Sequence, residues 1–119
     1  MARIGLMVVS VVGTVLAAAI GSASAQSAPP WCDNRGSKNP AERTICATES
    51  LWHLDDQLNL SYAFAHERLS AAQKKILEGS QASWLRATRD ACGTDVDCLA
   101  KAMQSRADAL DDINTRGRL

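Results

Sequence analysis

A corner between two helices is predicted by the stretch Trp84-Leu85-Arg86-Ala87-Thr88-Arg89-Asp90-Ala91-Cys92-Gly93-Thr94-Asp95-Val96-Asp97-Cys98. Gly93 is typical of the position just past a helix end, because glycine adopts left-handed backbone conformations at little cost. The segment from Thr94 to Asp97 can then cap the start of a new helix. Cys92 and Cys98 flank the break with five residues between them. The stretch therefore predicts a helix–turn–helix corner closed by a disulfide.

Capping signals on the N-terminal side of this corner predict three more helices. Asn39, Pro40 and Glu42 make a strong helix start, since asparagine can cap, proline suits the first helical position and Glu42 completes a capping box. Thr48 or Ser50 can cap the next helix. Ser70 and Gln73 repeat the capping-box pattern. With the helix after the corner, the predicted helices span residues 40–47, about 48–68, 71–91 and about 96–116.

Three- and four-residue spacing of apolar side chains predicts the inner face of each long helix. No segment alternates as a strand does. Short connections favour antiparallel neighbours. The sequence thus predicts an all-α fold, a small disulfide-stapled antiparallel bundle of one short and three long helices. The inner faces comprise Leu51, Leu54, Leu58, Tyr62, Ala65 and Leu69; Leu77, Trp84, Thr88 and Ala91, with Leu85 and Cys92 beside them; and Val96, Leu99, Met103, Ala107 and Leu110.

The first 25 residues are predicted to be a signal peptide. Arg3 supplies a positive charge, residues 4–20 are almost entirely apolar, and Ala23-Ser24-Ala25 is a small-residue cleavage pattern. An uncleaved anchor is the alternative, because the apolar run approaches the roughly 20 residues that span a membrane. Cleavage near Ala25 is favoured and leaves no stable membrane anchor. We expect a periplasmic or secreted protein with a lead-in and loop at 26–38 and a helical domain at 39–116.

The charge of the mature chain is balanced. Cleavage removes one of the 13 basic residues and none of the 13 acidic ones. Nucleic acid and anionic membranes are therefore not expected partners, since both require a basic surface.

All four cysteines follow the predicted cleavage site, and an even number in a small exported chain predicts two disulfides. Each bridge stabilises a small domain by about 2–4 kcal/mol. The gaps of 13, 45 and 5 residues contain no C-x-x-C pair, which disfavours structural zinc. The predicted bundle brings the cysteines to one end, where the local pairs Cys32–Cys46 and Cys92–Cys98 are favoured and Cys46–Cys92 is the rival.

Catalytic chemistry is not predicted. His53 and His66 lie 13 residues apart on one predicted helix, share no face and belong to no ligand pattern, so neither a metal nor another cofactor is expected. Two disulfides leave no thiol nucleophile. The acidic pairs Asp55-Asp56 and Asp111-Asp112 point apart on a helix and cannot act as dyads, so they are interpreted as solvated helix surface. The chain is not expected to be an enzyme.

Two further features concern helix surfaces. Leu60 and Phe64 lie opposite Leu58 and Tyr62 on the second helix, so they are either covered by the segment from 31 to 47 or exposed as an apolar strip for a partner. The first alternative is favoured. Arg106 lies at the edge of the fourth helix's apolar face, and a structural ion pair with a carboxylate such as Asp90 is favoured over a binding role.

These residues together resemble the LprI-like lysozyme-inhibitor domain of bacterial envelope proteins, from Cys32 to about Leu110. One departure is the spacing of Trp84 and Arg89, which is five residues where four is typical of many relatives. The residues that carry the resemblance are Cys32, Glu42 and Cys46; Leu54, Asp55, Asp56, Leu58, Asn59 and Tyr62; Gln81, Trp84, Arg89, Asp90, Ala91 and Cys92; and Cys98, Leu99, Arg106 and Leu110.

The resemblance implies a helical module that binds and inhibits lysozyme. Because the lysozyme cleft contains two catalytic carboxylates, a basic side chain inserted there would block the substrate. Arg35 and Lys38, or Lys74 and Lys75 near the opposite turn, are the candidate contacts. The competing hypothesis is an envelope scaffold module that meets a partner or a second copy through the strip of Leu60 and Phe64. An undetected hydrolase is a third and weaker alternative.

Overall fold

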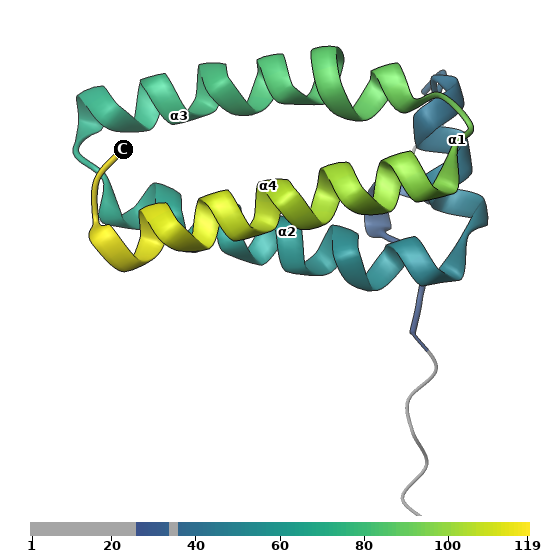
Figure 1. The fold of residues 1–119 in the computed structure, drawn as a ribbon, viewed down its shortest axis with the longest axis horizontal. Coiled ribbons are helices and arrows are strands. Elements are labelled where there is room, and N and C mark those ends of the chain that lie inside the picture. Colours follow the sequence, from purple (N-terminus) through teal and green to yellow (C-terminus); the bar gives the residue numbers. More distant parts are fainter. Residues whose placement is uncertain (1–25, 34–35) are drawn as a thin grey trace, which may run out of the picture.

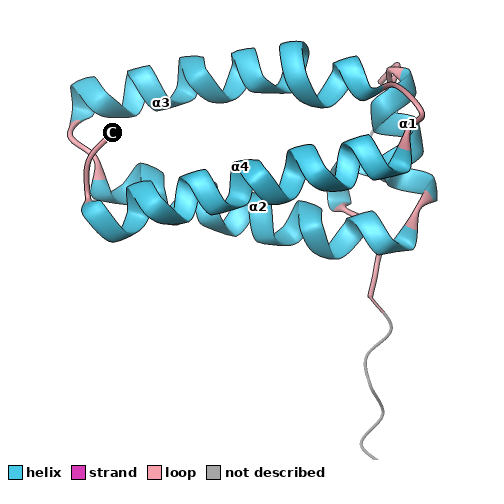
Figure 2. Ribbon diagram, in the orientation of Figure 1, coloured by secondary structure: helices cyan, strands magenta, loops and turns pink. Residues whose placement is uncertain are grey.

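The computed structural model describes residues 26–33 and 36–119, so the predicted signal peptide and Arg35 lie outside the described part. The described chain is helical with short connections and contains no strand (Figure 2). This confirms the predicted all-α bundle. The elements are η1 (Pro30–Asp33, a 3₁₀ turn), α1 (Pro40–Ala47), α2 (Glu49–Arg68), α3 (Ala71–Trp84), η2 (Leu85–Arg89, a π turn), η3 (Asp90–Cys92, a 3₁₀ turn) and α4 (Val96–Arg116).

The long helices are not packed equally. α2 and α4 pack against each other along their length. α3 runs alongside this pair but approaches α2 at few backbone positions (Figure 1). α1 closes the end of the bundle where α3 turns into α4. In the described residues, no helix is both long and apolar enough to cross a membrane.

The helix starts follow the predicted caps with one exception. The amide of Glu42 donates to Asn39 Oδ1 at 2.8 Å, and Glu42 returns the bond, so the capping box is complete. Ser70 caps α3. Asp95 caps α4 through the Cys98 amide at 3.0 Å. Thr48 takes the N-cap position of α2 without a side-chain bond.

The core joins α1, α2 and α4, with one residue from α3 and one from the turn before it. Its position follows from the inner faces predicted for α2 and α4, most of which are buried. Trp84 packs against this core but remains partly exposed. The buried apolar residues are Ala41, Ile45, Leu51, Leu58, Ala65, Leu69, Leu77, Leu99, Met103, Ala107 and Leu110.

Three inner-face predictions were wrong. Thr88 and Ala91 are exposed, because the α-helix ends at Trp84 and the π and 3₁₀ turns change the direction of later side chains. Val96 is 37% exposed. It is the first residue of α4, and at a helix end the apolar periodicity no longer guarantees a covering neighbour.

The favoured burial of Leu60 and Phe64 was also wrong, since they are 57% and 53% exposed. The segment from 31 to 47 does cover Trp52, whose indole Nε1 donates to the carbonyls of Ile45 at 3.0 Å and Cys46 at 3.3 Å. α1 has only eight residues, however, and reaches only the first turns of α2.

The disulfides form the two local pairs favoured from the sequence. Cys32 is joined to Cys46 with a Cα–Cα distance of 5.7 Å, and Cys92 to Cys98 with 5.5 Å. Gly93 between the second pair has a φ of +57°, which a side chain would strain. The corner therefore takes the predicted form of a glycine break closed by a disulfide.

Candidate functional site

A groove of about 570 Å³ separates α3 from α2 near the disulfide end of the molecule. Its volume is within the roughly 300–1,000 Å³ that small-ligand sites occupy. Four parts of the chain contribute to it: the N-terminal segment with α1, α2, α3 and the π turn. The residues that line it are Trp31, Gly36, Ser37, Lys38, Glu42, Asp55, Leu58, Asn59, Tyr62, Glu78, Gln81, Ala82, Leu85 and Arg89.

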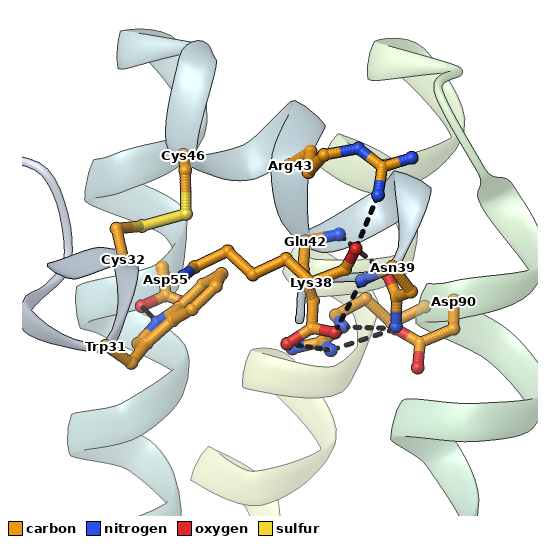
Figure 3. Close-up of polar contacts among 10 residues, drawn as sticks. Trp31, Cys32, Lys38, Asn39, Glu42, Arg43, Cys46, Asp55 and Asp90 are labelled. Carbon is orange, nitrogen blue, oxygen red and sulfur yellow. Dashed lines mark hydrogen bonds and ion pairs between the residues drawn. A yellow bond between two sulfur atoms is a disulfide. The ribbon is translucent and has the colours of Figure 1, made fainter. Parts of the chain in front are cut away.

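Asp55 is the buried carboxylate of this groove, with only 4% of its surface exposed. The predicted solvated position was therefore wrong for Asp55, because it lies at inner-face spacing between Leu51 and Leu58. Trp31 Nε1 and Asn59 Nδ2 both donate to Asp55 Oδ2, each at 3.0 Å, and Figure 3 shows the indole beside the carboxylate. Burial raises the pKa of Asp55, because a buried carboxylate loses hydration. The Trp31 bond and the charge of Arg89 act in the opposite direction without cancelling that effect.

Trp31 reaches Asp55 because its segment is fixed covalently. The next residue, Cys32, is bonded to Cys46 at the end of α1, and the Cys32 amide donates to the Pro29 carbonyl at 2.9 Å. The disulfide and the Trp31 side chain thus lie on the same side of α2 (Figure 3). The first disulfide therefore holds one wall of the groove in place.

Arg89 occupies the corner where α1 meets the π turn. Its Nε and one terminal nitrogen both lie 2.9 Å from Asp90 Oδ1, and Glu42 Oε2 is 4.0 Å away. Its guanidinium is also 6.0 Å from the centre of the Trp31 ring, within the range of a cation–π contact. Arg89 therefore links the capping box of α1 to the aromatic wall.

Arg106 does not pair with Asp90, so that predicted ion pair was wrong. Its Nε donates to Gln81 Oε1 at 2.9 Å, and a terminal nitrogen donates to Ser80 Oγ at 3.2 Å. Its guanidinium lies 6.0 Å from the Trp84 ring centre. Asp90 is instead used by its neighbour Arg89. Burial lowers the pKa of Arg106, which Tyr62 partly opposes. Arg106 thus fastens α3 to α4 from behind the groove.

A second fastening crosses the open side of the bundle from α2 to α3. His66 Nε2 lies 2.8 Å from Glu78 Oε1, and the His66 ring is 5.8 Å from the Tyr62 ring. Burial and the Glu78 carboxylate both raise the pKa of Tyr62, while Arg106 lowers it. Tyr62 therefore presents a protonated hydroxyl at neutral pH.

The predicted site residues lie at several places in the structure. Asp55, Leu58, Asn59, Tyr62, Gln81 and Arg89 line the groove, whereas Trp84, Asp90 and Arg106 support it from outside. Lys38 lies at its rim and extends toward Trp31 and Asp55 (Figure 3). Lys74 and Lys75 lie near the start of α3, and Leu60 and Phe64 border a separate hollow with α4.

Trp31 and Glu78 are groove residues that the sequence did not single out. Trp31 is distant in sequence from its partner, so its role depends on the tertiary fold. Asp55 carried a usable signal, because it lies at inner-face spacing between Leu51 and Leu58, where a carboxylate is unexpected.

The groove does not have the composition of a metal or redox centre. Within the described ranges, no group of three or more histidine, cysteine, aspartate or glutamate side chains is placed to hold a metal ion. Both cysteine pairs are disulfides. The groove presents hydrogen-bonding, charged and apolar side chains.

Comparison with known proteins identifies the family. Searches of curated proteins and of solved structures give no match. The family model described as "Lysozyme inhibitor LprI" matches residues 32–110, which include both disulfides, the core and every groove residue except Trp31. This match covers well over half of the chain, and the chain therefore belongs to the LprI lysozyme-inhibitor family.

Proposed function

We propose that this protein binds lysozyme and blocks its hydrolysis of peptidoglycan, acting as an inhibitor and not as an enzyme. The observation that carries the proposal is the family match across residues 32–110. Two disulfides and a completed capping box add rigidity, and a rigid binding surface loses less entropy on association.

The proposed contact surface is the disulfide end of the bundle, with Lys38 as the inserted basic residue. Lys38 lies directly before the capped start of α1, so its backbone is held by the Asn39–Glu42 capping box. Lys74 and Lys75 lie near the start of α3, the long helix that buries only Leu77. Lys38 is therefore the better candidate for insertion into the lysozyme cleft, which contains two carboxylates, because its backbone is held more firmly.

A turbidity assay of lysozyme acting on bacterial cell walls, together with direct binding to lysozyme, tests the proposal. The mature chain is expected to slow clearing and to bind. Lys38→Glu should weaken binding at least tenfold, which corresponds to about 1.4 kcal/mol. The matched control Lys74→Glu/Lys75→Glu should bind normally. No inhibition and no binding at large molar excess would defeat the proposal, and the reverse pattern of variants would move the contact to α3.

Export belongs to the same proposal, because two disulfides require an oxidising compartment. We propose cleavage near Ala25 and a periplasmic or secreted product. Mass spectrometry of the protein recovered from periplasm and medium should give an N-terminus at Gln26. Recovery of the full-length chain from membranes would instead favour the uncleaved anchor.

The exposure of Leu60 and Phe64 supports a second candidate function, an envelope scaffold without lysozyme activity. These side chains border a hollow together with Gln57, Gln104, Ala107 and Asp111. Leu60→Ser/Phe64→Ser should then abolish association with a partner or a second copy, seen by sedimentation and by co-purification from periplasm. If the double variant still inhibits lysozyme fully, the strip is not the inhibitory surface.

A further inference from the structure

We propose that the groove between α2 and α3 is a binding site for a short uncharged saccharide, with N-acetylated amino sugars as the chemical class. This goes beyond lysozyme inhibition, since the ligand is a small molecule and its binding requires no lysozyme. The proposal rests on the charges of the groove, its remaining hydrogen-bonding groups and its apolar lining.

The charged side chains of the groove already have partners. Arg89 contacts Asp90 at 2.9 Å and approaches Glu42 at 4.0 Å, and Glu78 contacts His66 at 2.8 Å. Asp55 accepts two hydrogen bonds. Lys38 adds a second cation at the rim. A strongly charged ligand would have to displace these pairs, so the groove favours a neutral ligand.

Groups that can still form hydrogen bonds remain on both α2 and α3, the two helices that border the groove. Of the residues that the structure describes, none bonds to the Tyr62 hydroxyl, the Asn59 amide oxygen or the Gln81 amide nitrogen. Asn59 uses its nitrogen for Asp55, and Gln81 uses its oxygen for Arg106. The Asn59 amide oxygen is thus an available acceptor and the Gln81 amide nitrogen an available donor, and each is oriented by the bond that the other end of its amide makes. The Tyr62 hydroxyl is oriented by the packing of its ring. Hydroxyl and acetamido groups of a sugar match this set.

The apolar part of the lining suits the other face of a sugar ring. Leu58, Ala82 and Leu85 line the groove, and the Trp31 ring forms its N-terminal wall. A pyranose ring has a face of C–H groups and a rim of hydroxyls, so it requires apolar and polar surfaces side by side. The acetamido methyl adds a further apolar group. A volume of about 570 Å³ accommodates two or three such rings in an open groove.

Titration with chitotriose tests the site in the absence of lysozyme. In ¹H–¹⁵N spectra, the Trp31 indole resonance should shift on saturation, whereas that of Trp52, which is covered by α1, should not. Asn59→Leu should weaken binding at least tenfold. The matched control Gln57→Leu, also exposed on α2 but bordering the hollow beside α4, should bind as the original chain does.

Several outcomes would overturn the proposal. No shift at ligand concentrations on the order of 10 mM would show that the groove does not take saccharides. Equal weakening by both variants would place the site elsewhere. Equal binding of cellotriose, which lacks acetamido groups, would refute the assigned chemical class. If lysozyme shifts the Trp31 resonance and chitotriose does not, the groove is a protein contact, so lysozyme binding stands while the saccharide site fails.

Discussion

Asp55 shows how one side chain can organise a surface. It lies at the spacing of a core position on α2, yet it is a carboxylate and retains two hydrogen bonds from Trp31 and Asn59. An unpaired buried carboxylate would be strongly destabilising. The Trp31 indole therefore satisfies Asp55, and the same contact brings the N-terminal segment against α2. The docking of the Trp31 segment against α2 and the burial of the Asp55 carboxylate therefore depend on each other.

The raised pKa of Asp55 predicts a pH-dependent contribution to stability. The folded state binds this proton more tightly than the unfolded chain, whose ordinary value is 3.8. The contribution is thus complete below that value and is lost as pH rises through the raised folded pKa. Asp55→Asn keeps an acceptor oxygen but cannot ionise, so its stability relative to the original chain should increase from acid to neutral pH.

Urea unfolding of both proteins at several pH values checks this prediction. Asp56→Asn, at the exposed neighbouring position, controls for the loss of one carboxylate from the same helix. A difference between Asp55→Asn and the original chain that stays constant with pH would contradict the assigned effect of burial.

The two ends of the apolar stripe on α4 should differ in their contribution to stability. Leu99 is fully buried, whereas Val96 is 37% exposed. Leu99→Ala should lower the free energy of unfolding by about 2–5 kcal/mol through lost burial and a cavity. Val96→Ala should change it by about 0.5 kcal/mol or less, as for other surface positions. Denaturant unfolding measures both, and equal losses would show that Val96 belongs to the core.

At the scale of elements, the π turn at 85–89 accommodates the five-residue spacing of Trp84 and Arg89. The Asp90 amide bonds to the Leu85 carbonyl five residues earlier, so one extra residue is accommodated in the turn. Trp84 can then pack on Arg106 while Arg89 faces Glu42 and Trp31. The five-residue spacing of Trp84 and Arg89 is thus accommodated locally.

Deletion of Ala87 should therefore be tolerated. After the deletion, Arg89 follows Trp84 by four positions instead of five, so the π turn becomes an α-helical turn and Arg89 keeps its direction. A single-alanine deletion at Ala102 in α4 is the control, because it rotates every later residue by about 100° and withdraws Met103, Ala107 and Leu110 from the core. Circular dichroism with thermal melting should show a folded first variant and an unfolded second one. An unfolded Ala87 deletion would refute this account of the turn.

At the scale of the whole molecule, the chain consists of a well-packed pair of helices and an outlying third. α2 buries five residues and α4 buries four, whereas α3 buries only Leu77. α3 is held at its ends by a turn and by the disulfide corner, and along its length by Arg106 and by the His66–Glu78 contact. The groove exists because α3 is attached without being packed closely against α2.

This difference predicts unequal hydrogen exchange. Amides of α3 should exchange faster than those in the central turns of α2 and α4, since local opening of α3 exposes little buried apolar surface. Hydrogen–deuterium exchange with mass spectrometry measures it by segment. Leu77→Ala should accelerate α3 selectively, while Ile76→Ala, at the 61% exposed neighbouring position, should not. Equal protection of all three long helices would contradict the description of α3 as less closely packed than α2 and α4.

The sequence by itself determined the helices, their inner faces in α2 and α4, the break at Gly93, the favoured disulfide partners and the family. These depend on local chemistry: capping side chains, three- and four-residue periodicity, and cysteines close in sequence. Periodicity failed where it was read through a helix end, at Thr88, Ala91 and Val96.

Only the tertiary structure decided the distance of α3 from α2, the exposure of Leu60 and Phe64, and the partners of Asp55, Arg89 and Arg106. Trp31 meets Asp55 across 24 residues and Gln81 meets Arg106 across 25. No local pattern specifies such pairs, because each partner is selected by which helix faces lie within hydrogen-bonding distance after packing. The groove is made of these long-range contacts, and for that reason it could not be derived from the sequence alone.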